Sequence, residues 1–332
     1  MSASARKEKF ISSLLQRNYR IFASKGQGTE MHLLNNESGK ARLRASEPKE
    51  GIKVPRKILV EEPATAPSMD HLDELEAQSI YILREAFARL KKLALLWSLG
   101  KDSNVMIWLA RKAFFGRVPF PAMHVDTGKK FPEMYAFRDR YAKEWDLDLR
   151  VEPCPPIDSV DPTLPPAARS AARKTEGLKL ALVKHGFDGL IAGIRRDEEA
   201  TRAKERVFSP RGLEGEWDVR DQPPEFWDHF NASPPQGAHL RIHPILHWTE
   251  ADIWAYTRRE NIPIIPLYLA KDGKRYRSLG DADITFPVAS TASNIDEILA
   301  ELEDTKVPER AGRALDHETE DAFERLRVAG YL

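Results

Sequence analysis

A short run of residues, Ser98 to Ser103, combines the groups that bind phosphate oxygens. It reads Ser-Leu-Gly-Lys-Asp-Ser and follows the apolar run Leu93 to Trp97. A strand that ends in a tight turn and opens a helix directs backbone N–H groups and the positive end of the helix dipole at one point. Gly100 permits close approach of the backbone, and Lys101 adds a mobile positive charge. The run therefore predicts a phosphate-binding loop.

The other polar residues of this loop have narrower roles. The hydroxyls of Ser98 and Ser103 can donate to phosphate or cap the helix. Asp102 would repel phosphate, so it is expected to cap the helix or to act through Mg²⁺. The spacing fits neither GxxxxGKS/T nor GxGxxG, and a helix start without a ligand is the alternative interpretation. The position favours nucleotide binding, because open α/β sheets bind ligands where their strands end.

A second charged run, Arg195 to Arg206, follows the apolar strand expected to end at Gly193. It should therefore lie at the same sheet edge as the loop. Arginine forks match the oxygens of tetrahedral anions. A solvated helix with pairs such as Glu198 and Arg202 is the alternative, but the position favours catalysis, with the acidic members orienting the arginines. The candidate catalytic residues are Arg195, Arg196, Asp197, Glu198, Arg202, Lys204 and Arg206.

Two further groups of residues are weaker candidates for the site. Asp126, Thr127 and Gly128 end the second expected strand, where a purely local turn would also favour Asp and Gly. Arg275 and Arg277 lie in a loop flanked by glycine and are possible contacts for phosphate or sulfate. No residue is assigned as a metal ligand.

These candidates need a scaffold of alternating strands and helices, and the hydrophobic pattern supplies one. Helical periodicity or character marks four early segments and a later one: Leu72 to Leu90, Val105 to Phe115, Phe131 to Trp145, Lys174 to His185, and Thr249 to Glu260. Apolar runs of strand length mark five others: Leu93 to Trp97, Ala122 to Asp126, Leu149 to Glu152, Gly189 to Gly193, and Leu240 to Leu246. The pattern predicts an open, parallel, doubly wound α/β sheet. His124, inside the second strand, is expected to be a core residue.

Composition and charge limit the possible partners, location and domain organisation of the protein. The 51 basic and 51 acidic residues cancel, so no nucleic-acid or membrane partner is expected. One cysteine and no long apolar run indicate a cytoplasmic protein. Residues 1–69 hold 13 Lys and Arg against seven Glu and no Asp, and predict a basic, weakly ordered extension. The expected catalytic domain covers 70–265, and 266–332 completes the site and offers a possible partner surface.

Several motifs resemble one family. SLGKDS resembles the SGGKDS signature of the PP-loop ATP pyrophosphatases. Trp97 to Phe114 resembles FxxGKDSxVMxxLARKAF, Val118 to Arg140 resembles LPFPxxHVDTGxxFxEMYxFRDR, and Ala192 to Arg211 resembles GGxRRDEExxRAKERxxSxR. These patterns are typical of the small subunit of the heterodimeric bacterial sulfate adenylyltransferase, and the resemblance covers Leu72 to Leu332.

The resemblance implies a fold of the adenine nucleotide alpha hydrolase-like type. It implies that ATP and sulfate give adenosine 5′-phosphosulfate and pyrophosphate in sulfate assimilation. ATP would enter with Mg²⁺, no tightly bound organic cofactor is expected, and a separate GTPase large subunit would be the partner. The loop Ser98, Gly100, Lys101, Asp102 and Ser103 would hold the phosphates, and Asp126, Thr127 and Gly128 would contact the nucleoside.

The chain also departs from the family pattern. The span Leu269 to Arg275 is short where the family has several dozen more residues, and Lys129 replaces an aromatic residue or histidine. A PP-loop adenylyltransferase with another acceptor, or a nucleotide-binding subunit without turnover, therefore remains an alternative. A phosphosulfate reductase would need a cysteine near the C-terminus, and no cysteine follows Cys154.

Overall fold

The computed structural model describes residues 69–198, 200–212, 217, 218, 220, 222–225, 229–233, 237–307 and 309. Contacts divide the chain into Met1–Ala66 and Pro67–Leu332, and every described residue belongs to the second unit. The expected basic extension, 1–69, lies outside the described residues except for Met69. No helix within the described part is long and apolar enough to cross a bilayer.

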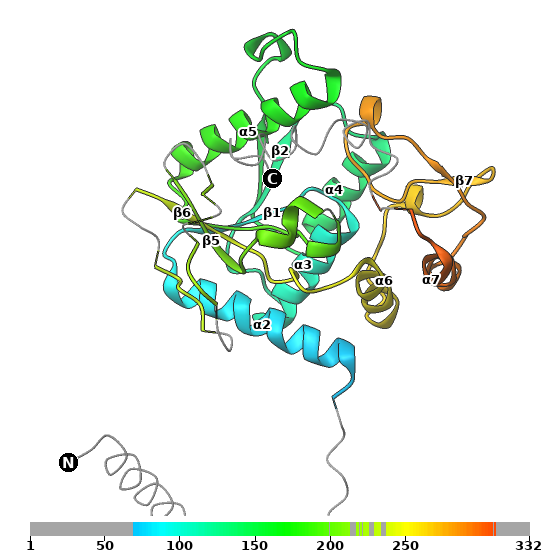
Figure 1. Cartoon of the computed structure of the whole chain (residues 1–332), viewed down its shortest axis with the longest axis horizontal. Helices are drawn as coiled ribbons and strands as arrows, with labels where there is room; N and C mark the ends of the chain where they lie inside the picture. Colours follow the sequence, from blue (N-terminus) through cyan, green and yellow to red (C-terminus); the bar gives the residue numbers. More distant parts are fainter. Residues whose placement is uncertain are drawn as a thin grey trace, which may run out of the picture. The chain divides into compact units, whose positions relative to one another are not determined.

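A six-stranded sheet forms the centre of the described unit, in the order β3-β2-β1-β4-β6-β5 (Figure 1). Its strands are β1 (Leu93–Leu96), β2 (Ala122–Asp126), β3 (Leu149–Pro153), β4 (Gly189–Ile191), β5 (Phe208–Arg211) and β6 (His239–Ile242). All neighbouring strands pair in parallel except β5, which runs antiparallel to β6. The prediction of an open, mostly parallel sheet is confirmed.

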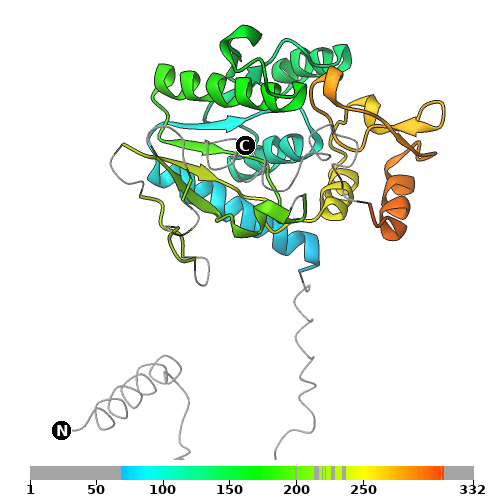
Figure 2. The ribbon, with the colours of Figure 1, turned by 45° about the horizontal axis from the view of Figure 1, so that its top comes forward.

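Helices cover both faces of this sheet, as the doubly wound prediction requires (Figure 2). The helices are α2 (His71–Arg89), α3 (Lys101–Ala113), α4 (Pro132–Glu144), α5 (Pro166–His185), α6 (Glu250–Arg259) and α7 (Ile295–Asp304). Leu93 and Leu95 of β1 join the core that includes α2 and α3, whereas Ala94 and Leu96 join the smaller core beneath α5. Alternate side chains of one strand therefore bury against opposite layers.

Helix starts follow local capping chemistry. Thr249 caps α6 in a capping box with Asp252. Helix α3 begins at Lys101, four residues before its expected start, because the phosphate loop leads straight into it with Gly100 as the N-cap. Helix α5 begins at Pro166, well before the expected Lys174, with proline in its first turn where a missing N–H costs nothing.

Strand β5 corresponds to none of the five strands that the sequence predicts. It is four residues long and contains Pro210, which cannot donate to a ladder and argues against a central strand. The sheet accommodates it at an edge, beside β6. The expected fifth strand, Leu240 to Leu246, ends at Ile242 because the chain then turns through Pro244.

The short span Leu269 to Arg275 closes in a tight hairpin. Lys271 and Lys274 exchange backbone hydrogen bonds of 2.8 and 3.1 Å across Asp272 and Gly273. Both central residues have positive φ, 53° and 77°, which is typical of a two-residue Asp-Gly turn. Lys274 also begins β7 (Lys274–Arg275), which pairs antiparallel with β8 (Val288–Ala289) in the segment between α6 and α7.

Candidate active site

A pocket opens beside the phosphate loop, where the central parallel strands end. Its lining comes from β1, α3, β2, α5, the segment after β4, and the loop 278–280: Leu96, Trp97, Ser98, Gly100, Lys101, Asp102, Ser103, Met123, His124, Val125, Lys130, Lys174, Thr175, Leu178, Ala192, Gly193, Ile194, Glu198, Arg202, Tyr268, Ser278, Leu279 and Gly280. All five predicted residues of the loop line this pocket. The location is the one at which open α/β sheets bind ligands.

The loop owes its shape to one unusual residue and two serines. Leu99 has a φ of 69°, in the left-handed region, and its side chain is fully buried. Ser103 Oγ donates to the carbonyl of Gly100 at 3.0 Å, and Ser98 Oγ donates to Ser103 Oγ at 3.2 Å. The hydroxyls thus fix the turn that opens α3. Gly193 packs against this turn, because a Cβ there would lie 3.3 Å from the Asp102 carbonyl carbon and the Ser103 nitrogen.

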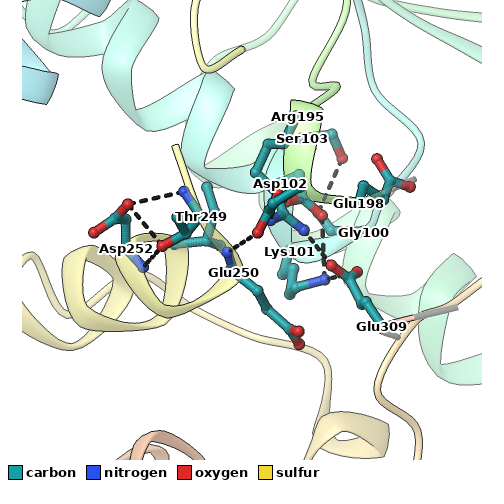
Figure 3. Close-up of polar contacts among 12 residues, drawn as sticks. Gly100, Lys101, Asp102, Ser103, Arg195, Glu198, Thr249, Glu250, Asp252 and Glu309 are labelled. Atoms are coloured by element: carbon teal, nitrogen blue, oxygen red, sulfur yellow. Dashed lines mark hydrogen bonds and ion pairs between the residues drawn. The ribbon is translucent and has the colours of Figure 1, made fainter. Parts of the chain in front are cut away.

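Two buried cations, Lys101 and Arg195, meet beside the loop (Figure 3). Arg195 Nε donates to Asp102 Oδ1 at 2.7 Å, and its other two nitrogens pair with Asp197 and Glu309. Lys101 Nζ pairs with Asp102 at 3.3 Å and also with Glu309. Burial disfavours the charged forms, but the carboxylates more than offset it, so the pKa of each cation is raised. Both cations therefore stay charged at neutral pH.

Two carboxylates of this cluster connect it to other elements. Asp197 Oδ2 accepts the backbone N–H of Glu250 at 2.7 Å, at the start of α6. Glu309 lies beyond α7, and its pKa is lowered because Lys101 and Arg195 overcome the effect of its burial. The local sequence predicts neither set of contacts. Asp197 is far from Glu250 along the chain, and Glu309 is far from Lys101 and Arg195.

Tyr268 contributes a further contact that the sequence does not predict. Its hydroxyl accepts the backbone N–H of Lys101 at 2.9 Å. This N–H belongs to the first turn of α3 and has no partner inside the helix. Burial raises the pKa of Tyr268 to about 12, so the phenol is neutral at physiological pH. The segment after α6 thus closes over the start of α3.

The charged run Arg195 to Arg206 follows β4. Some of its residues line the pocket, and others contact residues outside the lining. Glu198 and Arg202 line the pocket and form the predicted i,i+4 pair at 2.9 Å. They lie on short 3-10 helices, Arg196–Glu198 and Ala200–Lys204, rather than on one α-helix. Arg196 instead contacts His247 at 2.8 Å and the Glu205 carbonyl at 3.0 Å.

The last two basic residues of this run also lie apart from the pocket lining. The side chain of Lys204 is exposed. Arg206 presents its carbonyl to His243, whose Nδ1 lies 2.7 Å away. Arg195 is buried and does not line the pocket, but it contacts the lining residue Asp102.

The turn Asp126, Thr127 and Gly128 is held by contacts of its own. Asp126 Oδ1 accepts the backbone N–H of Gly128 and the hydroxyl of Tyr135, both at 2.8 Å. Thr127 Oγ1 donates to Asp281 at 2.7 Å. The pocket lining nearby comes from the preceding strand residues instead, among them His124. His124 is buried as expected, and burial lowers its pKa to about 4.

A buried carboxylate, Asp281, contacts two lysines of the pocket lining. Asp281 lies 3.0 Å from Lys130 Nζ and 2.9 Å from Lys174 Nζ, and it accepts a hydrogen bond from Ser170. Burial would raise its pKa, but the two lysines lower it below its ordinary range. Both lysines line the pocket and were missed from the sequence. A signal existed for Lys130, which follows the Asp-Thr-Gly turn by two residues.

Arg275 and Arg277 are engaged outside the pocket lining. Arg275 is buried and pairs with Glu301 of α7 at 2.7 Å. Arg277 pairs with Glu250 of α6 at 2.7 Å and donates to the Val307 carbonyl at 2.7 Å. Each arginine is thus paired with a carboxylate, and anion contact by either one stays a prediction. The three residues that follow Arg277 line the pocket in their place.

The parallel sheet, the strand–turn–helix phosphate loop and the pocket at the strand ends define a PP-loop α/β protein of the adenine nucleotide alpha hydrolase-like class. Residues 92–287 match the family described as phosphoadenosine phosphosulfate reductase domain. The chain is 43% identical over 302 residues to sulfate adenylyltransferase subunit 2 of Rhizobium johnstonii, a match that covers 81% of this chain and 95% of that protein. The chain belongs to the sulfate adenylyltransferase subunit 2 family.

Other relatives and solved structures are similar to the chain. Sulfate adenylyltransferase subunit 2 of Colwellia psychrerythraea is 42% identical over 300 residues, covering 80% of this chain and all of that protein. The relatives' name marks each of them as one subunit of a larger enzyme. The crystal structure of Candida glabrata FMN adenylyltransferase with ATP has a TM-score of 0.45 and 19% identity, covering 65% of this chain and 63% of that one.

Proposed function

We propose that this chain transfers the adenylyl group of ATP to sulfate, giving adenosine 5′-phosphosulfate and pyrophosphate. A sulfate oxygen would attack the α-phosphorus as the bond to the bridging oxygen of the β-phosphate breaks. Family membership supports the reaction. The observation that carries it in the molecule is a pocket lined by the whole phosphate loop, including Lys101, with Arg195 paired to the lining residue Asp102.

The two sides of the pocket suit the two ends of ATP. Its apolar lining, which includes Leu96, Met123, Val125, Leu178 and Ala192, suits the planar adenine base. The opposite side carries the loop and its cations, which suit the β- and γ-phosphates. The α-phosphorus would then lie between them, near the polar groups at the strand ends.

Charge neutralisation is the chemistry that these side chains can supply. Sulfate is a weak nucleophile with no proton to remove, so the reaction needs positioning and stabilisation of the leaving pyrophosphate rather than a general base. Lys101 and Arg195 keep their charges, and the start of α3 adds a positive dipole. Lys130 and Lys174 offer cations on the other wall for the incoming oxyanion.

Mg²⁺ is proposed to enter with ATP. No trio of His, Cys, Asp or Glu side chains suited to a metal occurs among the described residues. Mg²⁺ bound with a nucleotide needs only one or two protein carboxylates, and Asp102 and Glu198 both line the pocket. These residues therefore fit the ion, which would neutralise phosphate charge when bound.

A second subunit is part of this proposal. The relatives are named as subunit 2, and the family resemblance implies a large GTPase subunit whose hydrolysis drives an unfavourable activation. The chain itself contains no GxxxxGKS/T loop, so the GTPase would be a separate protein. The expected partner surface belongs to 266–332, of which 310–332 lies outside the described residues.

Pyrophosphate release from Mg²⁺-ATP, with and without sulfate, tests the proposal. Wild type, Lys101→Ala and Lys91→Ala would be compared, each alone and with the organism's candidate GTPase and GTP. Lys91 is an exposed lysine before β1 and serves as the matched control. Sulfate-dependent release that is lost only in Lys101→Ala supports the assignment. Release without sulfate dependence would indicate another acceptor, and ATP binding without release would indicate a subunit without turnover.

A further inference from the structure

The phosphate loop is occupied by the chain's own oxygen atoms. The backbone N–H of Lys101 donates to the Tyr268 hydroxyl. The ammonium group of Lys101 pairs with the Glu309 carboxylate (Figure 3). The side chain of Lys101 is 1% exposed and that of Arg195 is 0% exposed. The charged groups of both side chains are therefore engaged inside the protein while Glu309 remains in place.

The geometry of Glu309 is that of a bound anion. One carboxylate oxygen pairs with Lys101 Nζ and the other with Arg195 Nη2. Two oxygens on one central atom, bridging an ammonium and a guanidinium, present the same edge as two oxygens of a phosphate group. The carboxylate thus occupies a position to which a phosphate would be suited.

Charge repulsion also disfavours the presence of Glu309 and a phosphate group beside the two cations at the same time. Lys101 and Arg195 contact three carboxylates, those of Asp102, Asp197 and Glu309. A pyrophosphate group placed beside them would face Glu309 at close range in a poorly solvated site, where like charges repel strongly. If Glu309 leaves, two cations face two carboxylates and the incoming phosphates replace the lost negative charge.

We propose that Glu309 is an internal anion that the terminal phosphates of the nucleotide displace from Lys101 and Arg195. The inference rests on the proposed function in one respect, namely that the loop binds polyphosphate. It adds that nucleotide binding and the docked position of Glu309 on Lys101 and Arg195 exclude each other. Free pyrophosphate shares the recognised chemistry, so the product competes with Glu309 in the same way.

The described contacts show what would move. Glu309 follows α7, and Arg277 holds the preceding Val307 carbonyl at 2.7 Å while pairing with Glu250 of α6. Thr305 Oγ1 donates to the Glu301 carbonyl at 2.6 Å, at the end of α7. Displacement of Glu309 is therefore expected to loosen these two contacts of Val307 and Thr305.

Binding of inorganic pyrophosphate to the full chain tests this inference by calorimetry at fixed Mg²⁺. Glu309→Gln keeps the size of the side chain and removes its charge, so it is expected to bind pyrophosphate about tenfold more tightly than wild type, because the binding-competent fraction rises. Glu303→Gln removes an exposed carboxylate of α7 and is expected to match wild type. Unchanged or weaker binding in Glu309→Gln overturns the inference.

Hydrogen exchange of the wild-type chain gives a second measurement that does not depend on folding of the variant. Pyrophosphate is expected to speed amide exchange around 305–309 while slowing it at the start of α3. Protection of both regions would show that Glu309 stays in place and would overturn the inference. Sulfate-dependent turnover with no affinity change in Glu309→Gln would overturn this inference alone, whereas tighter pyrophosphate binding without sulfate-dependent turnover would overturn only the proposed function.

Discussion

Asp281 Oδ2 lies 2.9 Å from Lys174 Nζ, and this contact joins the segment after β7 to helix α5 at the wall of the pocket. Asp281 is completely buried and also contacts Lys130 and Thr127. One carboxylate thus fixes two pocket lysines and the turn after β2. Its removal should affect both the stability of the fold and the nucleotide site.

Asp281→Asn is expected to lower the free energy of unfolding by about 3 kcal/mol, because two buried or half-buried ammonium groups lose their shared counter-ion. Urea denaturation at neutral pH measures the change. Asp283→Asn is the matched control, since Asp283 is exposed and pairs with Lys129 at the surface, where a change under about 1 kcal/mol is expected. Equal losses in the two variants would contradict the role given to Asp281.

The sequence predicts the scaffold because the central strands are continuous apolar runs that need cover on both faces. It predicts the phosphate loop because the loop is local, with all its donors within Ser98 to Ser103. It does not predict β5, because Pro210 and the short length hide an edge strand that depends on β6 for its pairing.

The parts of the site that escaped prediction depend on contacts between distant segments. Tyr268, Asp281 and Glu309 all come from the segment after α6, and each is an ordinary residue in its local sequence. Arg275 and Arg277 show the reverse, because their local setting suggested anion binding and the fold supplies each with a carboxylate. Charged residues at a sheet edge can be predicted, but their partners are set by the tertiary fold.

Neighbouring arginines in the run after β4 should differ in their effect on catalysis. Arg195 contacts three carboxylates through three nitrogens, which a lysine cannot reproduce, so Arg195→Lys is expected to lower kcat/KM for adenylyl transfer about hundredfold. Arg196 contacts His247 and a backbone carbonyl, and Arg196→Lys is expected to change kcat/KM by about threefold or less. Steady-state kinetics on folded variants compare the two. An equal loss in Arg196→Lys would instead support the sequence-based prediction that both arginines are catalytic.

At position 99, the glycine variant should be more stable than the alanine variant, which is the reverse of the usual order. Both replacements lose the same buried side chain, but at a φ of 69° alanine keeps the left-handed strain that glycine avoids. Leu99→Gly is therefore expected to be more stable than Leu99→Ala by about 1 kcal/mol. Leu109, equally buried inside α3, is the matched position, where Gly should be less stable than Ala by about 1 kcal/mol. Urea unfolding measures the stability of the four variants. If glycine and alanine rank in the same order at both positions, the backbone strain assigned to Leu99 is refuted.

Buried histidines should make stability fall as pH is lowered below neutrality. Burial lowers the pKa of His243 from its ordinary 6.5 to about 4, so between these values the unfolded chain binds a proton that the folded chain does not. Stability is then complete above pH 6.5 and decreases toward pH 4, with His243 contributing about 1.4 kcal/mol per pH unit. His243→Gln is expected to reduce the slope of unfolding free energy against pH by that amount between pH 6 and pH 5. His71→Gln, at an exposed histidine, controls for loss of an imidazole, and an unchanged slope in His243→Gln would show that His243 does not supply this pH dependence.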